Sequence, residues 1–203
     1  MQHSFFRRAT LVALAAGLAG CAIWPFGGTT LIDADKGLDN WNRVGDANWR
    51  VQDGAIVADA GKGGFLVSKQ SYKDFVITAE FWAATDTNSG IFFRLSDPAR
   101  INPDNSYEAN IWDIRPDPTF ATGAIVNFAA VPNPPVYKAG GRWNTMEVRA
   151  EGDLLTVKLN GVQTAQVRNA KHASGPFALQ YGPGVQGATG GPIKWRKVQI
   201  RPL

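Results

Sequence analysis

The residues best placed to do chemistry lie on one face of a single predicted strand. Polarity alternates along residues 106–114, so Glu108, Asn110 and Trp112 share one face while mostly apolar side chains occupy the other. A carboxylate can move protons, an amide can donate and accept hydrogen bonds, and an indole can stack on an apolar ligand surface. The pattern predicts a polar site with an aromatic wall on this face.

A guanidinium on a second predicted strand could complete this site. In residues 90–95, Arg94 shares a face with Phe92, and the two strands could bring Arg94 and Glu108 together on one face of a sheet. In one interpretation Glu108 is a general base and Arg94 stabilises negative charge that develops on an oxygen. In the other, the two residues form a buried cross-strand ion pair that orients the sheet.

Further polar residues are candidates for the same site. Glu80 or Asp113 could supply a second acidic group, although strand parity places Asp113 opposite Glu108. Asn88 and Ser89 could donate hydrogen bonds to ligand hydroxyls, but a tight turn before a strand uses the same residue types. The full set that we expect to contact a ligand is Asn88, Ser89, Asn110, Trp112, Gln180 and Tyr181.

Short strands must position all of these residues. From residue 49 onward, period-2 runs bounded by Gly, Asn, Asp or Pro recur, and no segment longer than ten residues follows a helical period. The predicted strands are 49–57, 64–68, 75–82, 90–95, 106–114, 123–128, 143–150, 154–159, 177–180 and 194–200. So many short strands predict a single all-β sandwich domain.

Patterns within these segments indicate packing faces and turns. The packing face of residues 75–82 is predicted to be Phe75, Ile77, Ala79 and Phe81. We expect a hairpin at residues 151–153 and another at Asn160-Gly161, where a type I′ turn needs positive φ at both central positions. The side chains assigned to packing are Trp49, Trp143 and Trp195. His172 is assigned to a solvated loop.

Charge and motif content exclude several classes of function. The 203 residues include 21 Lys and Arg against 17 Asp and Glu, and removal of the first twenty residues, with Arg7 and Arg8, leaves 19 against 17. The basic residues are scattered, so we do not expect nucleic-acid binding. The sequence has no G-x-S-x-G, no H-E-x-x-H and no phosphate-binding loop, which disfavours nucleophilic serine and metalloprotease chemistry. We predict no metal and no other cofactor.

The N-terminal segment has the layout of a lipoprotein signal peptide. A short basic stretch precedes an apolar run that is too short for a transmembrane helix. The run ends in Leu18-Ala19-Gly20-Cys21, which resembles a bacterial lipobox whose cysteine is acylated, and Ala22 follows, as in lipoproteins sent to the outer membrane. We expect a signal peptide over residues 1–20, a linker over 21–30 that is lipid-anchored at Cys21 in the cell envelope, and a domain over 31–203.

Six short segments also follow one another in a specific order. They are Asp74–Phe81, Asn88–Arg94, Tyr107–Asp113, Thr122–Ile125, Gly141–Gly161 and Gly175–Gln180. In sequence and spacing they resemble the 3-keto-disaccharide hydrolase domain family, over roughly residues 31–203. The resemblance implies a concanavalin A-like jelly roll that binds carbohydrate and acts on glycosides oxidised to a ketone at carbon 3.

The chemistry that this resemblance implies begins at carbon 2 of the sugar. The ketone makes the hydrogen on carbon 2 acidic, so a base can remove it and the glycosidic oxygen can leave carbon 1, after which water can add. We hypothesise Glu108 as the base, Arg94 as the enolate stabiliser, and Glu80 or Asp113 as a second acid. In one departure, Tyr181 stands where family members often have a histidine shortly after the Leu-Gln pair.

Two other functions stay open. A non-catalytic, lectin-like module would bind glycans without turnover, and Tyr181 in place of histidine favours it. An ordinary retaining glycosidase needs two carboxylates about 5–5.5 Å apart. Residues 108–113 do not reproduce the Glu-x-Asp-x-x-Glu pattern of laminarinase-like relatives of the fold. Because jelly rolls host both binding and catalysis, the fold alone cannot decide between these functions.

Overall fold

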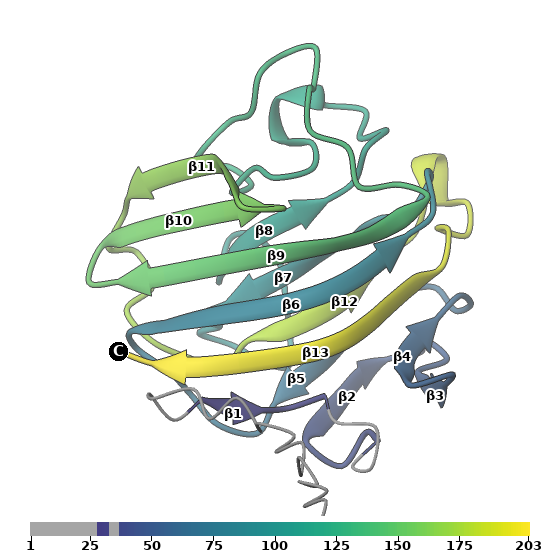
Figure 1. Cartoon of the computed structure of the whole chain (residues 1–203), viewed down its shortest axis with the longest axis horizontal. Coiled ribbons are helices and arrows are strands. Elements are labelled where there is room, and N and C mark those ends of the chain that lie inside the picture. Colours follow the sequence, from purple (N-terminus) through teal and green to yellow (C-terminus); the bar gives the residue numbers. More distant parts are fainter. Residues whose placement is uncertain (1–27, 33–36) are drawn as a thin grey trace, which may run out of the picture.

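Two antiparallel sheets lie face to face in the computed structural model, which describes residues 28–32 and 37–203 (Figure 1). The larger sheet has the strand order β11-β10-β9-β6-β13-β4-β3, with β1 also paired to β13. Its strands are β1 (Thr29–Thr30), β3 (Arg50–Gln52), β4 (Ala55–Ala58), β6 (Phe75–Ala83), β9 (Arg142–Glu151), β10 (Leu154–Leu159), β11 (Val162–Arg168) and β13 (Ile193–Pro202).

The smaller sheet lies behind the larger one in the same view and has the order β2-β5-β12-β7-β8. Its strands are β2 (Trp41–Gly45), β5 (Gly64–Ser68), β7 (Ser89–Phe93), β8 (Tyr107–Ile111) and β12 (Ala178–Tyr181). Two short 3-10 helices lie in loops, η1 (Pro118–Phe120) and η2 (Val185–Gly187). The prediction of an all-β sandwich is confirmed.

Alternation along the strands builds the core between the two sheets. The predicted packing face of β6 is buried, with Ile77, Ala79 and Phe81 fully inaccessible. Phe93 and Tyr107 meet them from the smaller sheet in the same hydrophobic cluster. Burial of each Ile or Phe side chain among them stabilises the fold by about 1.5–3 kcal/mol relative to leaving it exposed.

The two predicted hairpins are confirmed. β9 and β10 form one hairpin, in which Glu151 and Leu154 are the paired residues next to the turn. β10 and β11 are joined by Asn160 (φ 51°) and Gly161 (φ 81°), so both central residues adopt the left-handed conformation that a type I′ turn requires. Strand β11 was absent from the predicted strands, although the Asn-Gly turn called for a partner to β10.

Four predicted strands differ from the structure at turns. The strand predicted over 106–114 ends at Ile111, so strand parity does not place Trp112 or Asp113. Residues 49–57 form a hairpin of β3 and β4, because Asp53 and Gly54 both have positive φ. Residues 123–128 form turns, in which Ile125 makes isolated bridges to β8 and to Ala129. The strand predicted over 90–95 ends at Phe93, and the next residue has a φ of 54°.

The N-terminal predictions mostly lie outside the described residues. The predicted signal peptide over 1–20 and the lipidation site Cys21 fall in the part that the structure does not describe. Thr29 and Thr30, at the end of the predicted linker, pair with Ile200 and Gln199 of β13. Among the described residues, no helix has the length and hydrophobicity needed to cross a membrane.

Candidate functional site

The outer face of the smaller sheet holds the polar residues of β8. Tyr107, Ala109 and Ile111 belong to the core between the sheets, so Glu108 and Asn110 point to the other side. This alternation is the one predicted from the sequence. Both outward residues are nevertheless buried, at 4% and 0% exposure, because neighbouring side chains and loops cover this face.

A glycine makes room for these side chains. Asn110 pairs with Gly90 of β7, and the register of β12 on β7 places Gln180 on the other side of the same glycine. Glu108 uses the space, because a Cβ at position 90 would lie 3.2 Å from its Oε1 and 3.3 Å from its Cγ. Strands β8, β7 and β12 thus bring Glu108, Asn110 and Gln180 together around Gly90.

Apolar side chains form a floor beside Gly90 and Glu108. Glu108 pairs directly with Phe92, and the ring of Phe92 makes an edge contact with Phe65 at 5.3 Å between ring centroids. This hydrophobic cluster on the outer face comprises Val67, Phe92, Leu95 and Ala178, with Val44, Phe65 and Ile101 packed against it. The floor keeps water away from the carboxyl group of Glu108 on one side.

Burial changes the acidity of Glu108. Desolvation raises the pKa of its carboxyl from 4.5 to about 8, and it outweighs the positive charge of Arg115, which lowers the pKa. Glu108 takes part in none of the salt bridges formed by the described residues. A carboxyl group with a pKa near neutrality can accept and return a proton at physiological pH.

Several buried polar atoms near Glu108 have no partner within the protein. They are Asn110 Oδ1, Trp112 Nε1, Arg115 Nε and Gln180 Oε1. Each unpaired buried group costs about 1–3 kcal/mol, so such atoms need an explanation. Asn110 and Gln180 supply two acceptors beside Gly90, and Trp112 and Arg115 supply two donors beyond the end of β8. A bound ligand with hydroxyl and carbonyl groups would satisfy them.

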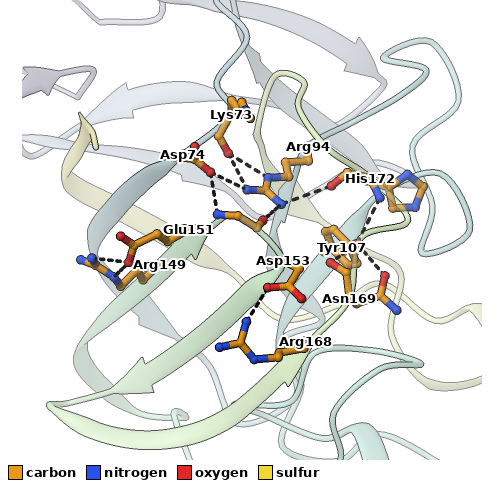
Figure 2. Close-up of polar contacts among 11 residues, drawn as sticks. Lys73, Asp74, Arg94, Tyr107, Arg149, Glu151, Asp153, Arg168, Asn169 and His172 are labelled. Carbon is orange, nitrogen blue, oxygen red and sulfur yellow. Dashed lines mark hydrogen bonds and ion pairs between the residues drawn. The ribbon is translucent and has the colours of Figure 1, made fainter.

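The structure does not bring Arg94 to Glu108. Arg94 follows the end of β7 with a φ of 54°, so period-2 parity does not apply to its side chain. Its guanidinium is 1% exposed and donates to Lys73 O at 2.6 and 2.9 Å, to Gly152 O at 2.9 Å, and to the carboxylate of Asp74 at 3.2 Å (Figure 2). Neither predicted role of the Arg94–Glu108 pair agrees with this geometry.

Figure 2 shows Arg94 at the centre of a network that joins loops at one end of the sandwich. Arg94 also donates to His172 O, and Tyr107 Oη donates to Asn169 Oδ1 at 2.7 Å while accepting from the His172 backbone N–H at 3.1 Å. His172 is only 8% exposed and its ring packs edge-on against Tyr107. The prediction of a solvated histidine was therefore wrong.

Glu80 lies on the opposite side of the molecule from Glu108. It belongs to β6, on the outer face of the larger sheet, where Arg196 Nε and Lys197 Nζ approach it at 2.7 and 3.0 Å. Burial alone would raise its pKa, but the hydrogen bonds from Lys197 and Arg196 outweigh burial and lower it. The core of the sandwich separates Glu80 from the candidate site, so it cannot be the second acid there.

Asp113 joins the loop after β8 to the loop before β9 through hydrogen bonds. Its carboxylate accepts hydrogen bonds from Thr122 Oγ1 at 2.6 Å and from the backbone N–H groups of Ala139 and Gly140 at 3.0 and 2.9 Å. These bonds hold residues after β8 against the segment that leads into β9. A carboxylate with three such donors is a structural anchor, which does not fit the predicted role of second acid.

Three residues that were predicted to contact a ligand instead form hydrogen bonds within the protein. Asn88 Nδ2 donates to Pro183 O at 2.7 Å, and Ser89 Oγ donates to the backbone carbonyl of Gln180 at 2.6 Å. Tyr181 is fully buried in the core and its hydroxyl donates to Gly190 O at 3.0 Å. These contacts hold the loop after β12 in place. Among the predicted residues, Glu108, Asn110, Trp112 and Gln180 retain groups that can act on a ligand.

Comparison with known proteins identifies the family. The model of the 3-keto-α-glucoside-1,2-lyase-like domain matches residues 27–201. The chain belongs to this family. The match confirms the resemblance drawn from the sequence, and it covers both sheets and every residue of the candidate site. No curated protein matches the chain.

Solved structures confirm the fold of this family member. Two proteins of Parabacteroides distasonis ATCC 8503, provisionally assigned as glycosyl hydrolases, are 24% and 19% identical, with TM-scores of 0.69 and 0.72. Each alignment covers 87% of this chain, and 100% and 94% of the respective structure. The carbohydrate-binding module CBM66 of Bacillus subtilis is 16% identical, with a TM-score of 0.60, over 80% of this chain and 95% of the module. The jelly-roll fold shared with glycosidases and carbohydrate-binding modules is thus shown.

Sequence reasoning missed Arg115 in this family member. Its guanidinium carbon lies 5.6 Å from the ring centroid of Trp112, and its charge acts on Glu108. Arg115 follows the strand, where no periodicity places a side chain on a face. The only signal was its position three residues after an indole that the strand pattern had already assigned to the site. Among residues 28–32 and 37–203, no three His, Cys, Asp or Glu side chains are grouped to hold a metal ion.

Proposed function

We propose that this protein cleaves the glycosidic bond of 3-keto-glycosides and that Glu108 is the base that removes the proton from carbon 2. The observation that supports this most is the buried Glu108 carboxyl, which has a pKa of about 8 and takes part in no salt bridge of the described residues. Family membership supports the substrate class. The unpaired polar atoms beside Glu108 support binding of a polyhydroxylated ligand there.

The burial of Glu108 suits it to this proton transfer. A carbon acid next to a ketone is weak, and a carboxylate with a raised pKa is a stronger base than an exposed one. In the first step, the Glu108 carboxylate takes the proton from carbon 2 and the electrons of the C–H bond form an enolate with the ketone at carbon 3. In the second, the enolate collapses, the ketone at carbon 3 re-forms and a double bond forms between carbons 1 and 2. The bond from carbon 1 to the glycosidic oxygen breaks, and that oxygen takes the proton that Glu108 holds.

Arg115 is the cation that we assign to the enolate. Arg94 is fully engaged at the end of the sandwich, whereas Arg115 Nε is buried without a partner near Trp112. A guanidinium beside the developing oxyanion lowers the barrier most when water is excluded, and the apolar floor around Phe92 supplies that exclusion. Addition of water to the double bond would complete hydrolysis, and without that addition the reaction is a lyase reaction.

We further propose that the reaction takes place in the cell envelope. The lipobox ending at Cys21 supports a lipid anchor, with the sandwich tethered through the residues before Thr29. Metabolic labelling with a radioactive fatty acid tests this directly. Label on the wild-type chain and none on Cys21→Ser is expected, whereas equal labelling of both would overturn the anchor.

Turnover of a 3-keto disaccharide tests the proposed reaction. The purified protein is incubated with the keto sugar and, separately, with its unoxidised parent, and the release of the aglycone sugar is followed. We expect release from the keto sugar alone, and its loss in Glu108→Gln. Glu80→Gln is the matched control, because it removes an acid of the same type on the opposite face and should keep wild-type turnover. Release from the unoxidised parent at an equal rate would contradict the proposal.

A lectin-like binder is the second candidate function. Tyr181 occupies the place where a histidine is common in the family, and its hydroxyl is committed to Gly190 O. If that histidine moves a proton in active relatives, this chain would bind without turning over. Saturable binding of the unoxidised disaccharide, with no product from either sugar, would establish this alternative.

A further inference from the structure

A second hollow lies on the outer face of the larger sheet, away from Glu108. One row of paired residues crosses five strands of that sheet, β3, β4, β13, β6 and β9. In order, the row is Arg50, Val57, Lys194, Trp82 and Trp143. A cavity of about 270 Å³ opens along this row, between Arg50 at one side and Trp143 at the other.

Small side chains make the floor of the hollow and larger ones make its walls. Ala55 and Val57 of β4 line the bottom, and Pro192 and Trp143 line one side. β4 lies next to β3, the edge strand of the sheet. Ala55 and Val57 are only 5% and 4% exposed, as expected of residues at the bottom of a hollow. The hollow is comparable in volume to the smaller pockets that take small molecules.

Trp143 is exposed where the sequence pattern predicted packing. It is 38% exposed, in contrast to Trp49 and Trp195, which are 4% and 0% exposed. The guanidinium of Arg196 lies 3.8 Å from the centroid of its ring, and this contact fixes the orientation of the indole. A rigid, partly exposed indole in the wall of a cavity is suited to stacking against the C–H face of a sugar ring.

Polar groups line the opposite rim of the hollow. Arg50 and Asp59 form a two-point ion pair, with N–O distances of 2.9 and 2.7 Å. Gln52 and Asp53 lie beside them, and Lys194 is held over the ring of Trp82, 5.0 Å from its centroid. The lining therefore contains two cations and two carboxylates, so its charges balance. Alternating donors and acceptors without a net charge match hydroxyl groups, which donate and accept at once.

We propose that this hollow is a binding site for a neutral saccharide unit of a glycan, stacked on Trp143 and hydrogen-bonded to the Arg50–Asp59 pair. The site goes beyond the proposed cleavage reaction, because it needs no ketone and no base. Its ligand lies on the far side of the core from Glu108. A glycan bound there leaves the face with Glu108 free, and it holds the domain next to further sugar chains.

Binding of neutral oligosaccharides tests the proposal. Isothermal titration of the purified protein with maltohexaose, cellohexaose and laminarihexaose should give saturable binding of at least one of them. Trp143→Ala should weaken that binding at least tenfold, and Asp59→Asn several-fold. Val162→Ala is the control, because Val162 is 55% exposed on β11 of the same sheet and outside the hollow, and it should bind as the wild type does.

The two faces can be separated in the same experiment. Glu108→Gln should bind the hexasaccharide with wild-type affinity, and a saturating hexasaccharide should leave turnover of a small 3-keto disaccharide unchanged. If the cleavage proposal fails, turnover is absent while the binding loss in Trp143→Ala persists. The binding proposal is overturned if the wild type binds none of the three sugars, or if folded Trp143→Ala and Asp59→Asn both bind as tightly as the wild type.

Discussion

The carboxyl group of Glu108 lies over Gly90 on the neighbouring strand, in space that any other residue would fill. A Cβ at position 90 would lie 3.2 Å from Oε1 of Glu108 and 3.0 Å from the backbone oxygen of Ala109. Gly90 lies between Asn110 on β8 and Gln180 on β12, so its missing side chain makes room for the carboxyl group of Glu108 beside both residues. The Asn88-Ser89-Gly90 segment thus serves the site mainly through its glycine.

Gly90→Ala should therefore reduce activity more than stability. The added methyl group has to displace the Glu108 side chain by a few tenths of an ångström, and small displacements of a catalytic group can cost up to about 100-fold in rate. We expect kcat on a 3-keto disaccharide to fall at least tenfold, with a fall in melting temperature of only a few degrees. Steady-state kinetics and thermal unfolding of the same sample check this, and unchanged kcat would contradict the placement of Glu108.

The pH dependence of turnover should report the titration of Glu108. A general base acts in its deprotonated form, and burial holds the pKa of this carboxyl at about 8. We expect kcat/KM to rise tenfold per pH unit below pH 8 and to level off above it. Rate measurements from pH 5 to pH 10 check the profile. A rate that instead falls above pH 8 would mean that protonated Glu108 acts as the acid.

Because Glu108 is buried, its ionisation at high pH should lower the free energy of unfolding. Its pKa is raised from 4.5 in the unfolded chain to about 8, so the native state binds more protons than the unfolded state between these values. The free energy of unfolding thus falls as pH rises through this window, by at most about 5 kcal/mol at about 1.4 kcal/mol for each pKa unit. Glu108→Gln lacks this loss, so it should melt higher than the wild type at pH 9 and similarly at pH 5.

Glu80→Gln provides the control of opposite sign. The hydrogen bonds from Lys197 and Arg196 lower the pKa of Glu80, so its charged form stabilises the native state above its pKa and that contribution disappears as pH falls. Its replacement should lower the free energy of unfolding at pH 9 by at most about 1 kcal/mol. If Glu80→Gln stabilised the protein at pH 9 as much as Glu108→Gln, the effect would not come from burial of Glu108.

Periodicity in the sequence predicted the parts of this site that lie inside strands. In β8, Tyr107, Ala109 and Ile111 point into the core, so the residues between them, Glu108 and Asn110, face outward. The pattern failed where a strand ends. Arg94, directly after β7, has a positive φ, which is rare for a non-glycine residue. The polarity pattern does not depend on φ, so the sequence could not predict this turn.

Loops account for the remaining differences. Arg115 and Asp113 follow β8, where no period fixes a side-chain direction, and only the fold shows that one approaches Trp112 while the other accepts bonds from Ala139 and Gly140. Trp143 is predicted to pack in the core, but its strand presents it on the outer face of the larger sheet, where it is 38% exposed. Composition cannot tell which face of a sandwich is left open.

Arg94→Lys should show whether Arg94 has a structural or a catalytic role, since the sequence allows both. The guanidinium joins Lys73, Gly152 and His172 through their carbonyl oxygens, and one ammonium group cannot reach all three. We expect the free energy of unfolding to fall by about 3 kcal/mol or more, because buried acceptors lose their donors. Urea denaturation measures this loss, and kcat/KM of the folded variant at low temperature should stay within a few-fold of the wild type. A large loss of kcat/KM with unchanged stability would instead place Arg94 in the reaction.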